Sequence, residues 1–224
     1  IDRFIHISTS EVYGTAITPL MGEDHPLNPC SPYAAAKAGA DRLVYSYVST
    51  YNIPAVIIRP FNMYGPKQHL EKAIPRFITS CILEEDITIH GDGKSKRDYT
   101  HVNDLAVAID LVIHAPLEKV RGEVLNVGSS KDCDIGTIAT KIHKIMCPLK
   151  SKLTFIGDRP GQVFRHTADA DKIKKLLDWE PQMDFERGLQ EVIGWYLQNK
   201  EWWLHKKWMR HVPIITASGI KELH

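Results

Sequence analysis

Short apolar runs alternate along this chain with longer stretches in which apolar residues recur every three or four positions. The short runs, most of them rich in Val and Ile, predict buried strands at residues 4–9, 54–59, 87–90, 123–127 and 153–156. Helical periodicity covers residues 31–51, 71–84, 102–114, 135–146, 169–177 and 185–199. Strands that alternate with helices predict an α/β fold built on a parallel sheet.

The helix predicted from residue 31 carries a tyrosine and a lysine four positions apart. Ser31 is a good N-cap, and Pro32 suits the first helical turn. Tyr33 and Lys37 then lie on one face, because positions i and i+4 are neighbours on a helix. A cation beside a phenol favours the phenolate, which can act as a base. The pair predicts a base for a hydroxyl proton; the alternative is an ordinary helix start with a surface tyrosine and lysine.

The first predicted strand ends in hydroxyl groups and a carboxylate. Phe4 to Ile7 is mostly apolar, and Ser8-Thr9-Ser10-Glu11 follows directly. Open α/β sheets bind their ligands at the carboxyl ends of their strands. We therefore expect Thr9, Ser10 and Glu11 to belong to the same site as Tyr33 and Lys37. The alternative for Glu11 is a strand-end carboxylate that caps a loop.

Further motifs follow these two in a fixed order along the chain. They are R-P-F-N-M-Y-G-P at 59–66, H-L-E-K-A-I-P at 69–75, G-D-G at 91–93, K-R-D-Y-T-H-V-N-D at 96–104, L-N-V-G at 125–128 and D-R-P-G at 158–161. Together the set resembles the extended short-chain dehydrogenase/reductases, the NAD-dependent epimerase/dehydratase family, and most of all its nucleotide-sugar 4,6-dehydratases. The resemblance implies a Rossmann-like doubly wound parallel sheet, partial here, with a smaller mixed α/β C-terminal region for the substrate.

The resemblance also implies catalytic roles. Tyr33 would remove the proton of the sugar 4-hydroxyl while hydride leaves C4 for NAD, and Lys37 would make the phenol more acidic and bind the nicotinamide ribose. Thr9 would orient the 4-hydroxyl oxygen. Once C4 is a ketone, the C5 proton is acidic, and Glu11 would remove it to begin the loss of water. Ser10 would relay a proton or hold a water, because serine itself is no proton source at neutral pH.

Residues 10 and 11 bear on the choice within the family. Simple 4-epimerases typically have a small or apolar residue at the position of Glu11, whereas UDP-glucuronate decarboxylases also carry Ser-Glu. Thymidine-diphosphoglucose dehydratases have Asp at the position of Ser10, and guanosine-diphosphomannose dehydratases have Thr-Ser-Glu. Reaction type is therefore expected to be 4,6-dehydration, with 4-epimerase and decarboxylase as alternatives. A decarboxylase needs an arginine for the uronate carboxylate, for which Arg165 is a candidate.

The same resemblance suggests binding residues. For the cofactor they are Tyr33, Lys37, Pro60 and Asn62. For the nucleotide sugar they are Asn62, Glu71, Lys72, Arg97, Asn126 and Arg159. The guanidiniums of Arg97 and Arg159 suit a diphosphate, because their planar forks match its oxygens. Asn126, at a strand end, has packing as its alternative role.

A glycine-rich dinucleotide loop such as G-x-x-G-x-x-G does not occur in this sequence. By comparison with the family, roughly three βα units of about 30 residues each are absent. We therefore expect a fragment of a longer enzyme: residues 1–66 as the C-terminal part of the dinucleotide-binding domain, and 67–224 as mainly the substrate region. The residue that distinguishes NAD from NADP is also absent. A non-catalytic sugar-nucleotide binder is the alternative of another class.

Composition narrows the expected partners. A net charge of +1 gives no indication of nucleic acid, and no apolar run is long enough to cross a membrane. Four cysteines and eleven histidines show no metal-ligand spacing, so we expect no metal and a cytoplasmic protein with reduced thiols. The aromatic and basic tail at 201–211 is expected to be the end of an amphipathic helix. The family resemblance implies a homodimer that uses the helix at 31–51.

Overall fold

A three-stranded parallel sheet holds the residues of interest. The computed structural model describes residues 1–157, 163–211, 213–215 and 221–223. The sheet has the order β1-β2-β6, formed by β1 (Phe4–Ile7), β2 (Ala55–Pro60) and β6 (Val124–Val127). Residues 55–59 of β2 are buried, as expected for a central strand that is covered on both faces.

The chain divides into two compact units. The first unit contains Ile1–Tyr64, Lys94–Asp134 and Asp158–Phe185. The second contains Gly65–Gly93, Ile135–Gly157 and Glu186–His224. The prediction of a dinucleotide part at 1–66 and a substrate part at 67–224 concerns function and stays a prediction.

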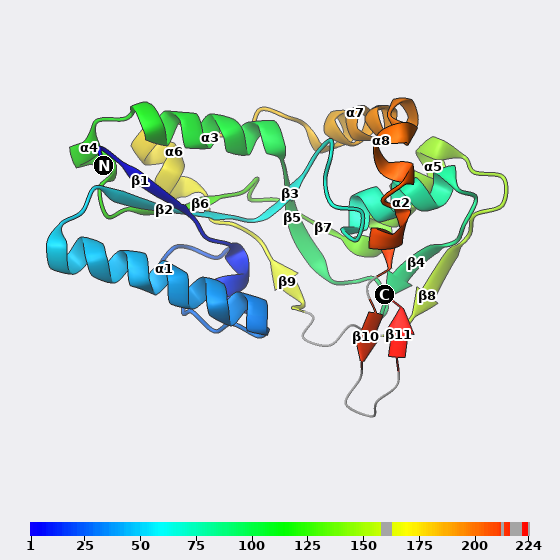
Figure 1. Cartoon of the computed structure of the whole chain (residues 1–224), viewed down its shortest axis with the longest axis horizontal. Coiled ribbons are helices and arrows are strands. Elements are labelled where there is room, and N and C mark those ends of the chain that lie inside the picture. Colours follow the sequence, from blue (N-terminus) through cyan, green and yellow to red (C-terminus); the bar gives the residue numbers. More distant parts are fainter. Residues whose placement is uncertain (158–162, 212, 216–220, 224) are drawn as a thin grey trace. The chain divides into compact units, whose positions relative to one another are not determined.

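Helices cover both faces of the β1-β2-β6 sheet in the first unit (Figure 1). On one side lies α1 (Pro32–Tyr51), and on the other lie α3 (Val102–His114) and α6 (Asp171–Leu177). Val56 and Ile58 of β2, which share a face because strand side chains alternate, pack with Val112 of α3 and Ile173 of α6. The short helix α4 (Leu117–Val120) leads into β6.

A second, more polar sheet belongs to the same unit. Its order is β3-β5-β7, with β9 beside β5. The strands are β3 (Asn62–Tyr64), β5 (Lys96–His101), β7 (Asp132–Asp134) and β9 (Arg165–His166). The parallel pairing of β5 with β9 places Arg97 opposite His166. These four strands had no counterpart among the predicted ones, because their sequences lack an apolar run.

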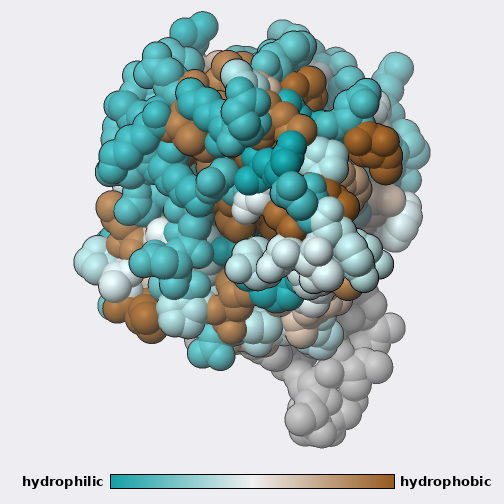
Figure 2. Space-filling model, turned by 90° about the vertical axis from the view of Figure 1, so that its left-hand side faces the viewer, coloured by the Kyte–Doolittle hydropathy of each residue, from teal (hydrophilic) through white to brown (hydrophobic). Residues whose placement is uncertain are grey.

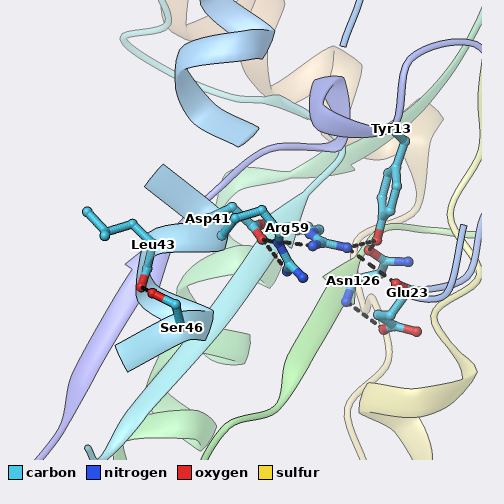
Figure 3. A network of polar contacts seen from close by, with 8 residues as sticks. Tyr13, Glu23, Asp41, Leu43, Ser46, Arg59 and Asn126 are labelled. Atoms are coloured by element: carbon cyan, nitrogen blue, oxygen red, sulfur yellow. Dashed lines mark hydrogen bonds and ion pairs between the residues drawn. The ribbon is translucent and has the colours of Figure 1, made fainter. Parts of the chain in front are cut away.

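The helix α1 begins and ends as its sequence predicts. Ser31 accepts a hydrogen bond from the backbone N–H of Ala34 (3.1 Å), and Asn52 ends the helix in the left-handed conformation. Its Asp41 is buried and lies beside Arg59 of β2 (Figure 3). Arg59 also donates to the hydroxyl of Tyr13 (2.9 Å), and this contact ties the helix and the strand to the turn that follows β1.

The second unit is a smaller α/β assembly. It contains α2 (Ala73–Ile82), β4 (Ile87–His90), α5 (Ile135–Met146), β8 (Leu153–Ile156), most of α7 (Phe185–Gln198), α8 (Lys200–Leu204), η2 (Lys207–Arg210), β10 (Pro213–Ile215) and β11 (Lys221–Leu223). The strands β4 and β8 are parallel, and β10 and β11 are antiparallel. Trp203 is buried and donates to the carbonyl of Tyr196 (2.9 Å), so the tail packs as a helix end.

The predicted helices and strands are observed with small shifts at their ends. The first strand stops at Ile7 instead of residue 9, because Thr9 caps a new turn. The helix predicted at 71–84 is observed at Ala73–Ile82, and the one predicted at 169–177 starts at Asp171. The predicted parallel α/β sheet is confirmed.

Candidate functional site

The turn η1 (Ser10–Tyr13) follows β1 after two residues and holds two of the predicted catalytic side chains. Thr9 begins it: its hydroxyl oxygen accepts a hydrogen bond from the backbone N–H of Glu11 (3.3 Å). Gly14 ends it with φ of 70°, and a Cβ at this position would lie 2.0 Å from the carbonyl oxygen of Asn28. Only glycine fits there. Ser10 and Glu11 are thus fixed close to the carboxyl end of the strand.

Lys37 connects the helix α1 to the same strand end. Its Nζ donates to the carbonyl oxygen of Ile7, the last residue of β1, at 2.6 Å. Tyr33 lies one helical turn before Lys37 and is 59% exposed. The lysine side chain therefore brings the start of α1 to the strand from which Thr9, Ser10 and Glu11 follow.

A histidine that the sequence did not single out completes this cluster. His166 of β9 is fully buried, and its Nε2 lies 2.7 Å from the carbonyl oxygen of Gly14. Its Nδ1 lies 3.4 Å from the hydroxyl of Ser10 and 3.8 Å from the Glu11 carboxylate. Burial lowers the pKa of His166, and the negative charge of Glu11 opposes that shift. From the sequence we considered the histidines only as metal ligands and assigned no role to His166.

Arg97 is the register partner of His166 and is almost completely buried. Its Nη1 donates to the backbone carbonyl of Lys96 (2.8 Å) and more weakly to that of Phe164 (3.4 Å). Within the described part of the chain, no carboxylate lies in ion-pair distance of this guanidinium. Burial lowers the pKa of Arg97. A buried cation without an anionic partner is costly, which suits a site that receives an anion.

The other predicted binding residues of the first unit differ in their surroundings. Pro60 ends β2, opposite Val127. Asn62 has a buried Oδ1 that meets no hydrogen-bond donor among the described residues. Asn126 is fully buried, and its amide accepts from the hydroxyl of Tyr13 (2.7 Å) and donates to the carbonyl of Met21 (2.9 Å). Contact of Asn126 with substrate stays a prediction, and the structure uses both ends of its amide for packing.

Two further predicted residues lie in the second unit, and one lies outside the described residues. Lys72 directly precedes α2, and its Nζ lies 3.5 Å from the carboxylate of Glu71. Arg159 falls in the segment 158–162, which the structure does not describe. Arg165, the alternative candidate for a uronate carboxylate, contacts Asp132 (2.6 Å) and Thr167 (3.2 Å). Its guanidinium therefore already has a carboxylate partner.

A buried polar network links α1, β2, η1 and β6 in the first unit (Figure 3). It runs from Asp41 through Arg59 and Tyr13 to Asn126, whose backbone N–H donates to Glu23 (2.7 Å). Burial raises the pKa of Tyr13 to about 12 and also raises the pKa of Glu23. Burial raises the pKa of Asp41 too, but hydrogen bonds from Arg59 and Arg42 outweigh this and hold the pKa at about 2.

The described residues hold neither a cluster of metal ligands nor a helix that could span a membrane. Among the described residues, no group of three or more His, Cys, Asp and Glu side chains is placed to hold a metal ion. No helix in the same part of the chain has the length and apolar character needed to cross a membrane. The face of the molecule seen in Figure 2 is mostly hydrophilic, with hydrophobic residues scattered across it.

Comparison with known proteins agrees with the geometry. Residues 2–192 match the family model of GDP-mannose 4,6 dehydratase. The low-salt glycan biosynthesis protein Agl12 of Haloferax volcanii is 41% identical over 201 residues, which are 90% of this chain and 64% of the relative. A dTDP-glucose 4,6-dehydratase of Actinoplanes is 37% identical over 91% of this chain and 62% of its own length.

Solved structures show the same likeness. The dTDP-glucose 4,6-dehydratase of Bacillus anthracis in complex with NAD has a TM-score of 0.85 and 36% identity, and the match covers 91% of this chain and 64% of that one. The fold is thus that of a Rossmann-like α/β protein. The chain belongs to the GDP-mannose 4,6-dehydratase family, as its motifs predicted. It spans less than two thirds of the length of these relatives.

Proposed function

We propose that this chain is the catalytic and substrate-binding part of an NAD-dependent nucleotide-sugar 4,6-dehydratase. The observation that carries the proposal is the bond from Lys37 to the carbonyl of Ile7. It anchors the Tyr33–Lys37 helix at the strand end that bears Thr9, Ser10 and Glu11. Membership of the family and the likeness to named 4,6-dehydratases support the reaction type.

The residues present fit the nicotinamide end of the cofactor. Asn62 offers a buried oxygen that needs a donor, and Lys37 offers a cation for a ribose hydroxyl. When bound, NAD would supply the acceptor for the C4 hydride and the hydride for C6, so that no net oxidation would occur. We assign no residue to the dinucleotide pyrophosphate, because the sequence contains no glycine-rich loop. Pro60, at the end of β2, is the remaining cofactor contact in the proposal.

Tyr33 and Thr9 perform the first proton step. Tyr33 removes the proton of the 4-hydroxyl, which allows C4 to become a ketone. Thr9 shares a hydrogen bond with the same oxygen and thereby fixes its direction. The exposure of Tyr33 leaves its hydroxyl free to meet a ligand.

Glu11 performs the second proton step. The 4-ketone makes the C5 proton acidic, and the Glu11 carboxylate removes it as a general base. Its side chain is about one third exposed and directly follows Ser10 in η1. Ser10 then passes a proton to the C6 hydroxyl, which leaves as water. This second base is what separates dehydration from simple inversion at C4.

Substrate binding in the proposal depends chiefly on Arg97. Its buried guanidinium, without a carboxylate in ion-pair distance among the described residues, suits the diphosphate of a nucleotide sugar. Arg159, Glu71, Lys72 and Asn126 remain candidates from the family resemblance. Neither the base nor the sugar is assigned.

A second candidate function is 4-epimerisation. The structure of UDP-glucuronic acid 4-epimerase from Bacillus cereus, in complex with UDP-glucuronic acid and NAD, has a TM-score of 0.83 and 32% identity to this chain. Epimerisation at C4 needs only the proton step assigned to Tyr33, so Glu11 would then have no chemical role. Decarboxylation is less well supported, because Arg165 is already paired with Asp132.

The test is to incubate the full-length protein, supplied with NAD, with a panel of nucleotide sugars and to identify the products by NMR. We expect a 4-keto-6-deoxy sugar. Inversion at C4, or carbon dioxide from a uronate, would replace the proposal with one of its alternatives. Absence of any product and of bound dinucleotide after denaturation would support a non-catalytic binder.

Assembly and location complete the proposal. Leu43, Tyr47 and Tyr51 are exposed on α1 at intervals of four residues, so they form one apolar stripe that suits a homodimer. Sedimentation of the protein and of a Leu43→Asp variant tests this, since the charged variant should dissociate. The four cysteines, all among the described residues, form no disulfide, which suits the cytoplasm.

A further inference from the structure

One nitrogen atom lies close to both the expected base and the expected acid. Nδ1 of His166 is 3.4 Å from the Ser10 hydroxyl and 3.8 Å from the Glu11 carboxylate. The imidazole is fully buried, whereas Glu11 is partly exposed. Ser10 is buried as well, so Glu11 is the one of these three side chains that solvent reaches.

The hydrogen bond at the other nitrogen fixes the tautomer. The carbonyl oxygen of Gly14 can only accept, so Nε2 of His166, 2.7 Å away, must carry a hydrogen. In the neutral ring Nδ1 is then an acceptor, and the Ser10 hydroxyl donates to it. A proton gained at Nδ1 reverses this bond. The Ser10 oxygen then accepts from Nδ1–H, and its own hydrogen can point at a ligand.

This arrangement supplies what a serine lacks on its own. Loss of the C6 hydroxyl as water requires a proton, and a serine hydroxyl cannot release one at neutral pH without regaining one at the same time. The proton that Glu11 has just taken from C5 is the nearest source. Nδ1 of His166 lies within 3.8 Å of the Glu11 carboxylate and 3.4 Å of the Ser10 hydroxyl, so it can connect the two.

We propose that His166 is a positioning residue through which the proton removed from C5 by Glu11 reaches Ser10 and then the departing C6 hydroxyl. This rests on the proposed 4,6-dehydration. The C5–H bond breaks, its electron pair forms the C5–C6 double bond, and the C6–O bond breaks with its pair on oxygen. Glu11 passes its proton to Nδ1, Nδ1 passes one to Ser10, and Ser10 passes one to the leaving oxygen. Water forms, and each residue returns to its starting state.

The charges around the imidazole suit a carrier that is neutral at rest. Arg97 on β5 and His25, which precedes α1, both disfavour a charged ring, whereas the Glu11 carboxylate and the hydrogen bond to the Gly14 carbonyl favour it. Burial acts in the same direction as Arg97 and lowers the pKa of His166. Once Glu11 has taken a proton, its negative charge is gone, so the ring passes a proton on instead of keeping it.

A purely structural role is the competing explanation, because His166 also donates a hydrogen bond to the carbonyl oxygen of Gly14. The variant His166→Gln separates the two, since an amide can still donate to the Gly14 carbonyl but has no basic nitrogen in the position of Nδ1. A substrate with fluorine in place of the C6 hydroxyl separates them again. Fluoride leaves with little need for a proton, so it bypasses any relay.

The experiment compares wild type, His166→Gln, Ser10→Ala and the exposed control His205→Gln in the full-length protein with NAD. We expect reduced nicotinamide to form at the wild-type rate in all four. With the 6-hydroxyl substrate, elimination should slow roughly 10²- to 10⁴-fold in the first two variants. With the 6-fluoro substrate it should return to within a few fold of wild type. The double variant that combines His166→Gln with Ser10→Ala should be no slower than either single variant.

Three outcomes would overturn the relay. Equal turnover of the 6-hydroxyl substrate by wild type and His166→Gln removes the need for the histidine. Equal slowing of both substrates, also in Ser10→Ala, indicates loss of structure instead of loss of a proton path. If the wild type forms no 4-keto-6-deoxy sugar, the relay falls together with the proposed function, whereas the first two outcomes leave that function intact.

Discussion

Arg59 and Asp41 form a bidentate ion pair in the interior of the first unit, with hydrogen bonds of 2.9 Å from Nε and from Nη2. Both side chains are almost completely inaccessible to solvent. The pair joins β2 to the middle of α1, one helical turn after Lys37. The position of the Tyr33–Lys37 face relative to the strand end therefore depends on a charge pair that touches no substrate in the proposed mechanism.

Removing the carboxylate of that pair should destabilise the protein strongly. Asp41→Asn leaves Arg59 buried beside a neutral amide, and the free energy of unfolding should fall by about 3–5 kcal/mol. Urea denaturation measures it. The control is Asp110→Asn, whose exposed pair with His114 on α3 should be worth less than about 0.5 kcal/mol. Equal effects of the two variants would show that the buried pair contributes nothing special.

The same carboxylate predicts acid sensitivity. The pKa of Asp41 is lowered from 3.8 to about 2, so its contribution to stability is fully present above the unfolded value and is lost as the pH falls toward 2. The loss should amount to about 2 kcal/mol. We expect this loss of stability when the unfolding free energy of the wild type is measured between pH 5 and pH 2, roughly the range that spans the folded and unfolded pKa values. In Asp41→Asn the dependence of the unfolding free energy on pH should be shallower.

The phenol of Tyr33 should be needed before any other chemistry. Tyr33→Phe removes the base for the 4-hydroxyl, so reduced nicotinamide should form at least about 10²-fold more slowly. Stopped-flow absorbance of the nicotinamide measures this step. Tyr45→Phe, an exposed tyrosine in the middle of the same helix and outside the proposed dimer stripe, is the matched control and should behave as wild type.

The carboxylate of Glu11 should be needed only afterwards. In Glu11→Gln, C4 oxidation should proceed while elimination slows by roughly 10²- to 10⁴-fold, so reduced nicotinamide and a 4-keto hexose should accumulate. Rapid quench with mass spectrometry detects the intermediate. Glu118→Gln, exposed on α4, serves as control. An enzyme that turns over normally with Gln at position 11 would argue for epimerisation.

Arg97 should weaken the free fold while it strengthens binding. Replacing it with Met removes a buried cation that has no carboxylate in ion-pair distance among the described residues, so the thermal midpoint should stay the same or rise. Affinity for a nucleoside diphosphate should fall about 10- to 100-fold, as expected for lost charged hydrogen bonds. Calorimetry on the wild type and on Arg97→Met measures both the thermal midpoint and the affinity. A large loss of stability with unchanged affinity would make Arg97 a structural residue.

The sequence predicted those parts of the fold whose stability comes from apolar periodicity. The helix at 31–51 and the strand at 54–59 are examples, because capping residues and β-branched runs mark them directly. The strand β5 was missed because K-R-D-Y-T-H contains no apolar alternation. Its buried Asp98 is held instead by hydrogen bonds from Ser129, Ser130 and Ala168, which lie far along the chain. Such tertiary partners leave no local signal.

The candidate site divides in the same way. Tyr33, Lys37 and the Thr9–Glu11 segment were predicted from spacing and from motifs, since each pair of partners is close in sequence. His166 was not, because its only marks are three-dimensional: complete burial and contacts with Gly14, Ser10 and Glu11. A histidine in a two-residue strand has no periodicity that could reveal it.

Ser10 and His166 are separated by 156 positions in the sequence, which sets the order in which they are synthesised. During synthesis β1 and the helix that starts at Pro32 emerge from the ribosome long before β9 is made. The hydroxyl of Ser10 therefore lacks its imidazole partner until 156 further residues have been added. We expect competence for elimination to follow the emergence of β9.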